Sequence, residues 1–306
     1  CSSDLEATAP WSVSALHTKD FAPRVLPDSE HLIPYHIVTS GSCWAGLAGQ
    51  PQVHLQEGDA FVLPQGDPHI LSSDHGQWAA EGAHGEAPAR SPSTVVIGDS
   101  TQHDVTFVCG FLGCDARPFN PLLAALPPVL HVAGAAGGWL GEFPRQVVAE
   151  SRAGRLGAET LLTRMAELMF IEVVRRHLES LPPQERGWLA GLRDEVVGPA
   201  LTCLHERPSH PWTLADVAHA VGASRSVLAE RFTAVLGVPP MQYLQQWRLQ
   251  LAAHLLSTTT EKVAAIGARV GYESEAAFSR AFKRAAGTSP AGYRTTRPRQ
   301  LQSAPV

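Results

Sequence analysis

The stretch LADVAHAVG at residues 214–222 is repeated as VAAIGARVG at residues 263–271. Both copies have aliphatic residues at the first, fourth and eighth positions, small residues at the second and fifth, and glycine at the ninth. Aliphatic residues at this spacing bury one face of a short helix, and the small residue lets a second helix cross closely. The glycine ends the helix in a left-handed turn. The repeat therefore predicts two helix-turn-helix units.

A second helix is predicted after each of these glycines. Ser224 and Ser274 are the expected N-caps, and the apolar anchors of the two helices recur fifty residues apart. The same offset relates the later pairs Gly237 and Gly287, Pro240 and Pro290, and Tyr243 and Tyr293. Between the units, residues 241–257 are predicted to form one long helix that fixes the spacing of the two second helices.

The outer faces of the second helices carry short polar and basic side chains that fit the major groove of DNA. Arg280 is expected to contact guanine O6 and N7, and Glu230 at the matching position either accepts from cytosine N4 or makes a local ion pair. The alternative is a duplicated helical bundle without a role in DNA binding. The predicted DNA-contacting residues are Ser224, Arg225, Ser226, Ala229, Glu230 and Thr233 in the first unit and Ser274, Glu275, Ala276, Ala277, Ser279, Arg280, Lys283 and Arg284 in the second.

The charge distribution favours a polyanionic partner for the C-terminal third. From residue 199 onward there are 12 Lys and Arg against 6 Asp and Glu, whereas residues 1–198 have 12 against 23. A basic region beside an acidic body indicates that this region meets nucleic acid. The five cysteines are scattered and lack CxxC spacing, which fits a reducing cytoplasm. No apolar run reaches the roughly 18 residues of a membrane span, so no membrane partner is expected.

The rest of the chain changes from a strand pattern to a helix pattern near residue 118. Short β-rich runs separated by Gly, Pro, Ser and Asp fill residues 11–111. Residues 158–178 carry a broad apolar stripe at helical spacing, which predicts a helix that packs on the strands or mediates dimerisation. We therefore predict a β domain at 1–118, a helical dimerisation or linker region at 119–198, an all-α domain at 199–296 and a tail at 297–306.

Residues 212–294 resemble the DNA-binding domain of the AraC/XylS family of regulators. The resemblance is carried by GYES at 271–274, FSRAFK at 278–283 and GTSPAGYR at 287–294, and it covers about a quarter of the chain. It implies a transcriptional regulator that binds double-stranded promoter DNA and contacts RNA polymerase if it is an activator. It also implies an N-terminal domain that senses an unknown effector or forms a homodimer.

The segment GDAFVLPQGDPH at residues 58–69 matches the second cupin motif, G-x5-P-x-G-x2-H, which implies a barrel with His69 pointing inward. His36 resembles a remnant of the first cupin motif, so the metal set of a cupin enzyme is incomplete. The layout resembles the sensor domain of an AraC/XylS branch that includes a regulator responsive to reactive chlorine. That resemblance brings His36, His69 and Cys109 together, with Cys1 as a further candidate ligand.

Two interpretations of these four residues remain open. Imidazole and thiolate ligands suit zinc, so the cluster would be a metal or redox sensor. Alternatively, the histidines are ordinary barrel-interior residues and Cys109 is a small buried hydrophobe.

The predicted fold is α+β, with an N-terminal cupin-like β-barrel followed by helices and an all-α C-terminal domain with two helix-turn-helix units joined by a long helix. The predicted function is sequence-specific transcriptional regulation without catalysis, controlled by a small molecule, metal or oxidant. The alternative function is a cupin metalloenzyme fused to a DNA-binding domain.

Overall fold

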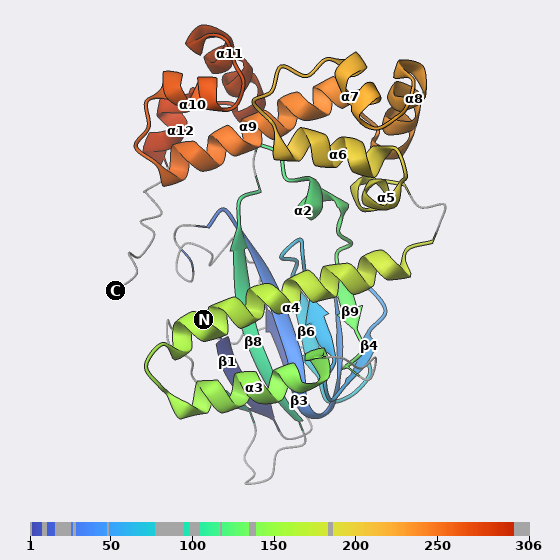
Figure 1. The fold of residues 1–306 in the computed structure, drawn as a ribbon. Coiled ribbons are helices and arrows are strands. Elements are labelled where there is room, and N and C mark those ends of the chain that lie inside the picture. The colour runs from blue at the N-terminus through green and yellow to red at the C-terminus, as the bar shows by residue number, and fades with distance from the viewer. Residues whose placement is uncertain are drawn as a thin grey trace. The chain divides into compact units, whose positions relative to one another are not determined.

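The computed structural model divides into two compact units (Figure 1). The first unit combines Cys1–Cys114 with Leu126–Ser180, and the second combines Asp115–Ala125 with Leu181–Val306. The structure describes residues 2–7, 11–15, 26, 29–47, 49–76, 95–97, 105–116, 118–134, 139–182 and 186–296. Within these ranges, no helix has both the length and the apolar character needed to cross a membrane.

The described part of the first unit is built on a nine-stranded sheet. Neighbouring strands follow the order β2-β6-β3-β8-β1-β7, while β4 and β5 also pair with β3, and β9 pairs with β5. All pairs are antiparallel except β1 with β7. The strands are β1 (Ser2–Ala7), β2 (Ser12–Ala15), β3 (His31–Leu47), β4 (Val53–Gln56), β5 (Ala60–Val62), β6 (His69–Ser72), β7 (Val95–Ile97), β8 (Val105–Cys114) and β9 (Leu130–Val132).

The long strand β3 organises this sheet. Its first part pairs with β8 and β5, and its last part pairs with β4 and β6. The register against β8 shifts between Val38 and Ser40, and a bulge of this kind bends a strand so that it can serve two sheets. The core enclosed by these strands includes Trp11, Val38, Leu55, Phe61, Leu63 and Phe107.

Buried Asp59 connects the cupin-motif turn to β9. Its carboxylate accepts hydrogen bonds from the backbone N–H of Gln56 at 3.1 Å, the backbone N–H of Gly134 at 2.8 Å and His131 Nε2 at 2.9 Å. Strand β9 therefore completes the first unit, which continues past the predicted boundary at residue 118. A three-residue strand is too short to produce a period-2 pattern, so β9 could not be predicted from residue spacing.

Helices α3 (Trp139–Ala153) and α4 (Ala158–Ser180) pack against each other in the first unit, and α4 lies against β9. The apolar residues of α4 lie on two faces. Ala166, Met169 and Val173 are buried, whereas Leu161, Leu168 and Ile171 are exposed. The helix predicted at 158–178 is thus confirmed, and part of its apolar stripe packs inside the unit.

The described part of the second unit is helical. Its helices are α2 (Pro121–Ala125), α5 (Trp188–Arg193), α6 (Val197–Glu206), α7 (Leu214–Ala220), α8 (Arg225–Leu236), α9 (Pro240–Thr258), α10 (Val263–Arg269), α11 (Glu275–Ala286) and α12 (Pro290–Thr296). Helices α7 and α8 form one helix-turn-helix unit, and α10 and α11 form the other, with α9 as the long helix between them (Figure 1).

Helix α9 contributes to both cores of the second unit. Tyr243 and Leu244 lie in the core of the first helix-turn-helix, whereas Leu249, Ala252 and Leu256 lie in that of the second. The predicted long helix at 241–257 is therefore confirmed to within a residue at each end. Because both cores are built on one helix, α9 fixes the spacing of α8 and α11.

Candidate functional site

The two helix-turn-helix turns have the geometry that the repeat predicts. Gly222 and Gly271 have φ values of 68° and 90°, in the region that favours glycine. Ser224 Oγ accepts from the Val227 N–H at 3.2 Å, and Ser274 Oγ accepts from the Ala277 N–H at 3.3 Å. Both serines are therefore the N-caps of α8 and α11, as predicted.

The predicted DNA-contacting residues lie on the accessible sides of α8 and α11. Glu230 and Arg280 are exposed at matching positions of the two helices, so the two outer faces differ in charge. The residues that hold these helices in place are buried, namely Leu228, Phe232, Phe278 and Phe282. Of the fourteen predicted residues, Ala229, Ala277 and Ser279 are half-buried and the other eleven, Ser224, Arg225, Ser226, Glu230, Thr233, Ser274, Glu275, Ala276, Arg280, Lys283 and Arg284, are exposed.

Sequence reasoning missed one feature of α8. Val227 is 47% exposed in the first turn of this helix, although an aliphatic residue in a repeated pattern would be expected to pack inward. Its counterpart in the second unit is Ala277, which is half-buried.

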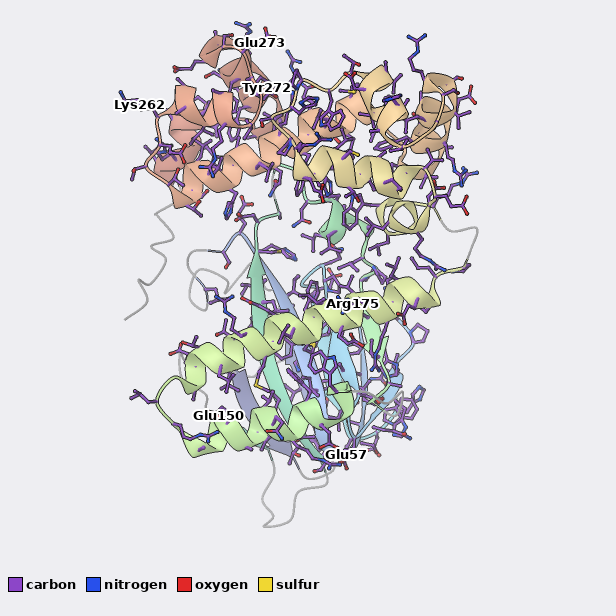
Figure 2. The ribbon with its side chains drawn as sticks, in the orientation of Figure 1. Glu57, Glu150, Arg175, Lys262, Tyr272 and Glu273 are labelled. Atoms are coloured by element: carbon purple, nitrogen blue, oxygen red, sulfur yellow. The ribbon has the colours of Figure 1, made fainter. Side chains whose placement is uncertain are left out.

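The charged residues Lys262 and Glu273 of the second helix-turn-helix unit are exposed and flank α10 (Figure 2). Arg294, another basic residue of this region, donates to the carbonyl oxygen of Glu261 at 2.6 Å.

The predicted sensor residues of the first unit come together between β3, β6 and β8. His36 Nδ1 lies 2.9 Å from Cys109 Sγ, and His36 Nε2 lies 2.6 Å from His69 Nε2. His69 Nδ1 is 3.1 Å from the Asp67 carbonyl oxygen. His36 and Cys109 are directly opposite each other in the β3–β8 pairing, and His69 begins β6. His36 and His69 are buried, and Cys109 is half-buried.

The proton positions in this cluster follow from its two ends. A carbonyl oxygen only accepts, so His69 Nδ1 carries a hydrogen, and neutral His69 therefore accepts at Nε2. His36 must then donate from Nε2 and accept at Nδ1, where the Cys109 thiol donates. Burial and the neighbouring His69 hold the pKa of His36 well below 6.5, and burial lowers the pKa of His69 to about 4. Both imidazoles are thus neutral at pH 7, as this chain of hydrogen bonds requires.

The three side chains are arranged as a hydrogen-bonded chain and not around one position. His69 and Cys109 lie at opposite nitrogens of the His36 ring, so the three donor atoms do not point at one position. Zinc ligands must surround a single ion at about 2.0–2.3 Å. Among the described residues, no group of three or more His, Cys, Asp or Glu side chains could hold a metal ion. Cys1 lies outside the described residues, and the zinc site stays a prediction.

None of the other described cysteines forms a disulfide. Cys43 is buried, and burial together with Asp59 raises its pKa to about 12, so it is a neutral packing residue. Cys114, at the end of β8, is half-buried, as is Cys203 in α6.

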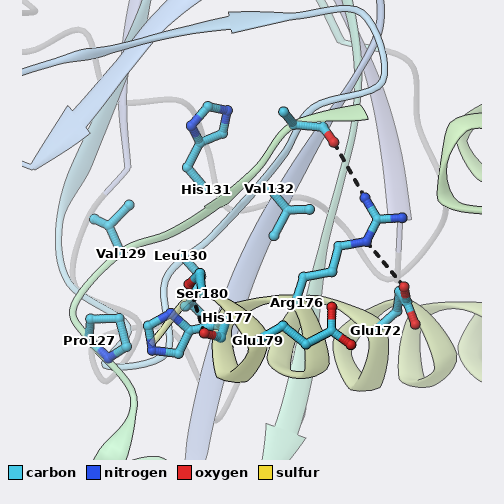
Figure 3. A pocket seen from close by; sticks show the side chains of 11 residues that line it. Pro127, Val129, Leu130, His131, Val132, Glu172, Arg176, His177, Glu179 and Ser180 are labelled. Carbon is cyan, nitrogen blue, oxygen red and sulfur yellow. Dashed lines mark hydrogen bonds and ion pairs between the residues drawn. The ribbon is translucent and has the colours of Figure 1, made fainter. Parts of the chain in front are cut away.

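A cavity of about 670 Å³ lies between β9 and the end of α4 (Figure 3). Arg176 from α4 reaches across it, donating to Glu172 at 3.1 Å and to the Ala133 carbonyl oxygen at 3.5 Å. His131, on the opposite wall, is paired with Asp59. Arg176 thus joins α4 to the residue after β9, and His131 joins β9 to Asp59, which indicates a packing role for the cavity walls.

Comparison with known proteins identifies both units. A cupin model matches residues 2–179, and a helix-turn-helix domain model matches residues 217–296. A putative AraC-like transcription regulator of Streptomyces antibioticus is 36% identical over 88% of this chain and 89% of its own. The HTH-type transcriptional regulator AlkR of Acinetobacter baylyi is 31% identical over 85% of this chain and 86% of its own. The RCS-specific HTH-type transcriptional activator RclR of Escherichia coli is 30% identical over 88% of this chain and 86% of its own. The chain therefore belongs to the AraC family of transcriptional regulators and carries a cupin domain before its DNA-binding helices.

Proposed function

We propose that this regulator senses a two-electron oxidant at Cys109 and that oxidation changes how α8 and α11 bind promoter DNA. The observation that carries the proposal is the hydrogen-bonded chain from the Cys109 thiol through His36 and His69 to the Asp67 carbonyl. A thiol that only fills space in a core does not need a base at 2.9 Å. The relative named as an RCS-specific activator is consistent with this class of signal.

The hydrogen bond between Cys109 and His36 lets the imidazole accept the thiol proton. When the sulfur attacks an oxidant such as hydrogen peroxide or hypochlorous acid, the thiol proton passes to His36 Nδ1. The sulfur loses two electrons. With hydrogen peroxide it takes one oxygen and becomes a sulfenic acid, and the leaving hydroxide takes the proton from His36 to form water. With hypochlorous acid it first takes the chlorine, and the hydroxide leaves as water with the proton from His36; water then hydrolyses the sulfenyl chloride to the sulfenic acid and releases hydrogen chloride. Because the pKa of His36 is low, the resting centre is a neutral thiol and a neutral imidazole.

On the DNA side, we propose that α8 and α11 enter successive major-groove faces and prefer different bases. Arg280 would pair with guanine in one half of the operator. Glu230, at the matching position, would accept from cytosine N4 in the other half or stay paired within the protein. The lysine and arginine near the end of α11, Lys283 and Arg284, would contact phosphates and make binding sensitive to salt.

We further propose that the regulator is a cytoplasmic homodimer formed through α4. The exposed residues Leu161, Leu168 and Ile171 follow the i, i+7, i+10 spacing of a coiled-coil seam. A second copy of the same helix offers a matching stripe under twofold symmetry. Two linked DNA-binding units would then bind a bipartite operator more tightly than one. If the protein is an activator, contact with RNA polymerase would follow at the promoter.

The sensing proposal is tested with Cys109→Ser and, as a matched control on the same strand, Cys114→Ser. The operator is first selected from a random duplex pool by the full chain. Its affinity is then measured by fluorescence anisotropy before and after treatment with hypochlorous acid or hydrogen peroxide. We expect the wild type and Cys114→Ser to change affinity on oxidation, and Cys109→Ser to stay constant. His36→Ala should slow oxidation of Cys109, as followed by mass spectrometry of the sulfenic acid.

Two results would contradict the sensing proposal. One is a Cys109→Ser variant that responds to oxidant like the wild type. The other is a stoichiometric metal in the purified protein that is lost in both Cys109→Ser and His69→Ala, which would favour a zinc sensor. A cupin metalloenzyme, the alternative function, would need a convergent set of ligands, and the described residues supply none.

A further inference from the structure

A short segment of the chain belongs to the DNA-binding unit although it lies between two strands of the cupin domain. Strand β8 ends at Cys114, the next residues, Asp115–Ala125, group with the second unit, and the chain rejoins the first unit at Leu126. We call Asp115–Ala125 the strap. The chain passes between the two units at only two other places, after Ala125 and after Ser180.

The strap is attached to one face of α9. The Phe119 ring meets the Tyr243 ring edge-on, with centroids 5.6 Å apart and an interplanar angle of 84°. The Phe119 N–H donates to Gln250 Oε1 at 2.9 Å, and Asp115 lies 3.8 Å from His254 Nδ1. Asp115 raises the pKa of His254, which is the expected effect of a carboxylate on an imidazole. The three α9 residues are spaced i, i+7 and i+11, so they share one side of the helix.

The strap also has internal order. Asn120 Oδ1 accepts from the Leu123 N–H at 2.9 Å and begins α2, while its amide donates to the Asp115 carbonyl oxygen at 2.8 Å. Leu123 is buried, and α2 lies against α5 (Figure 1). The strap is therefore a folded part of the second unit with its own caps and side-chain contacts.

The attachment point on α9 is itself rigid. The Tyr243 hydroxyl accepts from Trp188 Nε1 at 2.8 Å and meets His205 Nε2 at 2.8 Å. Burial lowers the pKa of His205 to about 4, so at pH 7 this imidazole is neutral and accepts the tyrosine proton. Phe119 thus packs on a side chain whose position is fixed by hydrogen bonds from α5 and α6. A force on the strap would act on α9 as a whole.

We propose that the strap is the mechanical link by which β8 of the sensor acts on the two DNA-reading helices. The strap begins directly after β8, the strand that carries Cys109. It packs on α9, which contributes to both helix-turn-helix cores. A change in the path of β8 would displace α9 as a whole and move α8 and α11 with it. This inference rests on the proposed sensing role of the cupin domain.

Coupling between two sites is reciprocal, so operator binding must change the properties of the sensor. We therefore measure the rate at which iodoacetamide alkylates Cys109 in the full chain, by mass spectrometry, with and without the selected operator duplex. In the wild type the operator should change this rate about fivefold or more, in line with common coupling strengths. A Gly-Gly insertion between Cys114 and Asp115 should reduce the change to less than about twofold.

The matched control is a Gly-Gly insertion between Leu181 and Pro182, which lengthens another connection between the units and should keep the wild-type response. A second variant, Phe119→Ala with Gln250→Ala, leaves the chain length unchanged and should also lose the response while retaining operator binding. An equal response in the wild type and the Cys114 insertion would overturn the proposal, as would no response in the wild type. If Cys109 proves insensitive to oxidants but its alkylation still depends on operator and strap, the sensing proposal fails and the strap stands.

Discussion

The two helix-turn-helix turns offer a matched pair of glycine substitutions. Gly222 and Gly271 end the first helix of each unit with positive φ, yet their surroundings differ. A Cβ added at Gly222 would meet nothing within 4 Å. A Cβ added at Gly271 would lie 2.9 Å from the guanidinium carbon of Arg248 and 3.0 Å from the Ser209 Cα. We therefore predict that Gly271→Ala destabilises the DNA-binding unit more than Gly222→Ala.

The magnitudes follow from these contacts. Placing alanine in the left-handed region costs roughly 1–2 kcal/mol, and this is the whole expected effect at Gly222. At Gly271 the guanidinium of Arg248 must also move. Arg248 donates to the Pro208 carbonyl oxygen at 2.7 Å and to the His210 carbonyl oxygen at 2.8 Å. Weakening these two charge-assisted hydrogen bonds adds about 2–3 kcal/mol, for a total of roughly 3–5 kcal/mol.

Urea unfolding of the two single variants, followed by tryptophan fluorescence, measures the difference. Gly271→Ala should also weaken operator binding, because Arg248 joins α9 to the loop before α7 and so links the two reading units. Adding Arg248→Ala to Gly271→Ala should recover part of the loss attributed to the clash. Equal destabilisation by Gly222→Ala and Gly271→Ala would refute the argument from Arg248.

Three further predictions concern base reading, pH and assembly. Arg280→Ala should weaken operator binding by about 1–3 kcal/mol and relax the base preference at one position of the operator. Lys283→Ala should reduce the slope of log affinity against log salt concentration by about one, without changing the base preference. The free energy of unfolding of the cupin unit should decrease as pH falls from 6.5 towards 4. The pKa of His69 is about 4 in the folded state and 6.5 in the unfolded state, so the unfolded chain binds a proton in this range that the folded chain does not. His69→Gln should reduce this pH dependence in urea titrations. Leu168→Glu should convert the proposed dimer to a monomer in sedimentation equilibrium, and a mass equal to that of the wild type would exclude α4 as the interface.

The elements with a repeated or periodic pattern were predictable from the sequence. The two helix-turn-helix units and their serine caps follow from positions that recur forty-nine or fifty residues apart, and the long helix between them follows from its own apolar periodicity. The meeting of His36, His69 and Cys109 was also expected, although through a family resemblance and not from spacing. Side-chain periodicity could not give the order of donors and acceptors, since this depends on which ring nitrogen faces which partner.

The middle of the chain was the part that sequence reasoning could not resolve. Strand β9 has three residues and is specified by its pairing with β5 and by the carboxylate of Asp59, both distant in the sequence. The membership of Asp115–Ala125 in the second unit depends on contacts more than a hundred residues away, such as Phe119 with Gln250. Tertiary contacts of this kind leave no local signal, so a boundary placed at the change of pattern near residue 118 differs from the structural one.

If Cys109 is the sensor, as we propose, strand β8 would allow this single thiol to affect both reading helices. It pairs with β3 from Val105 to Cys114, so its backbone is held along its whole length and cannot absorb a local change by bending freely. Oxidation of Cys109 adds an oxygen and removes the thiol donor to His36, at a position where β3 and β8 are in direct register. The paired strands must then separate locally or shift together, and either response moves Cys114, to which the strap is covalently joined. A sensor residue on β4, which pairs with β3 and does not lead into the strap, would lack this covalent connection to α9.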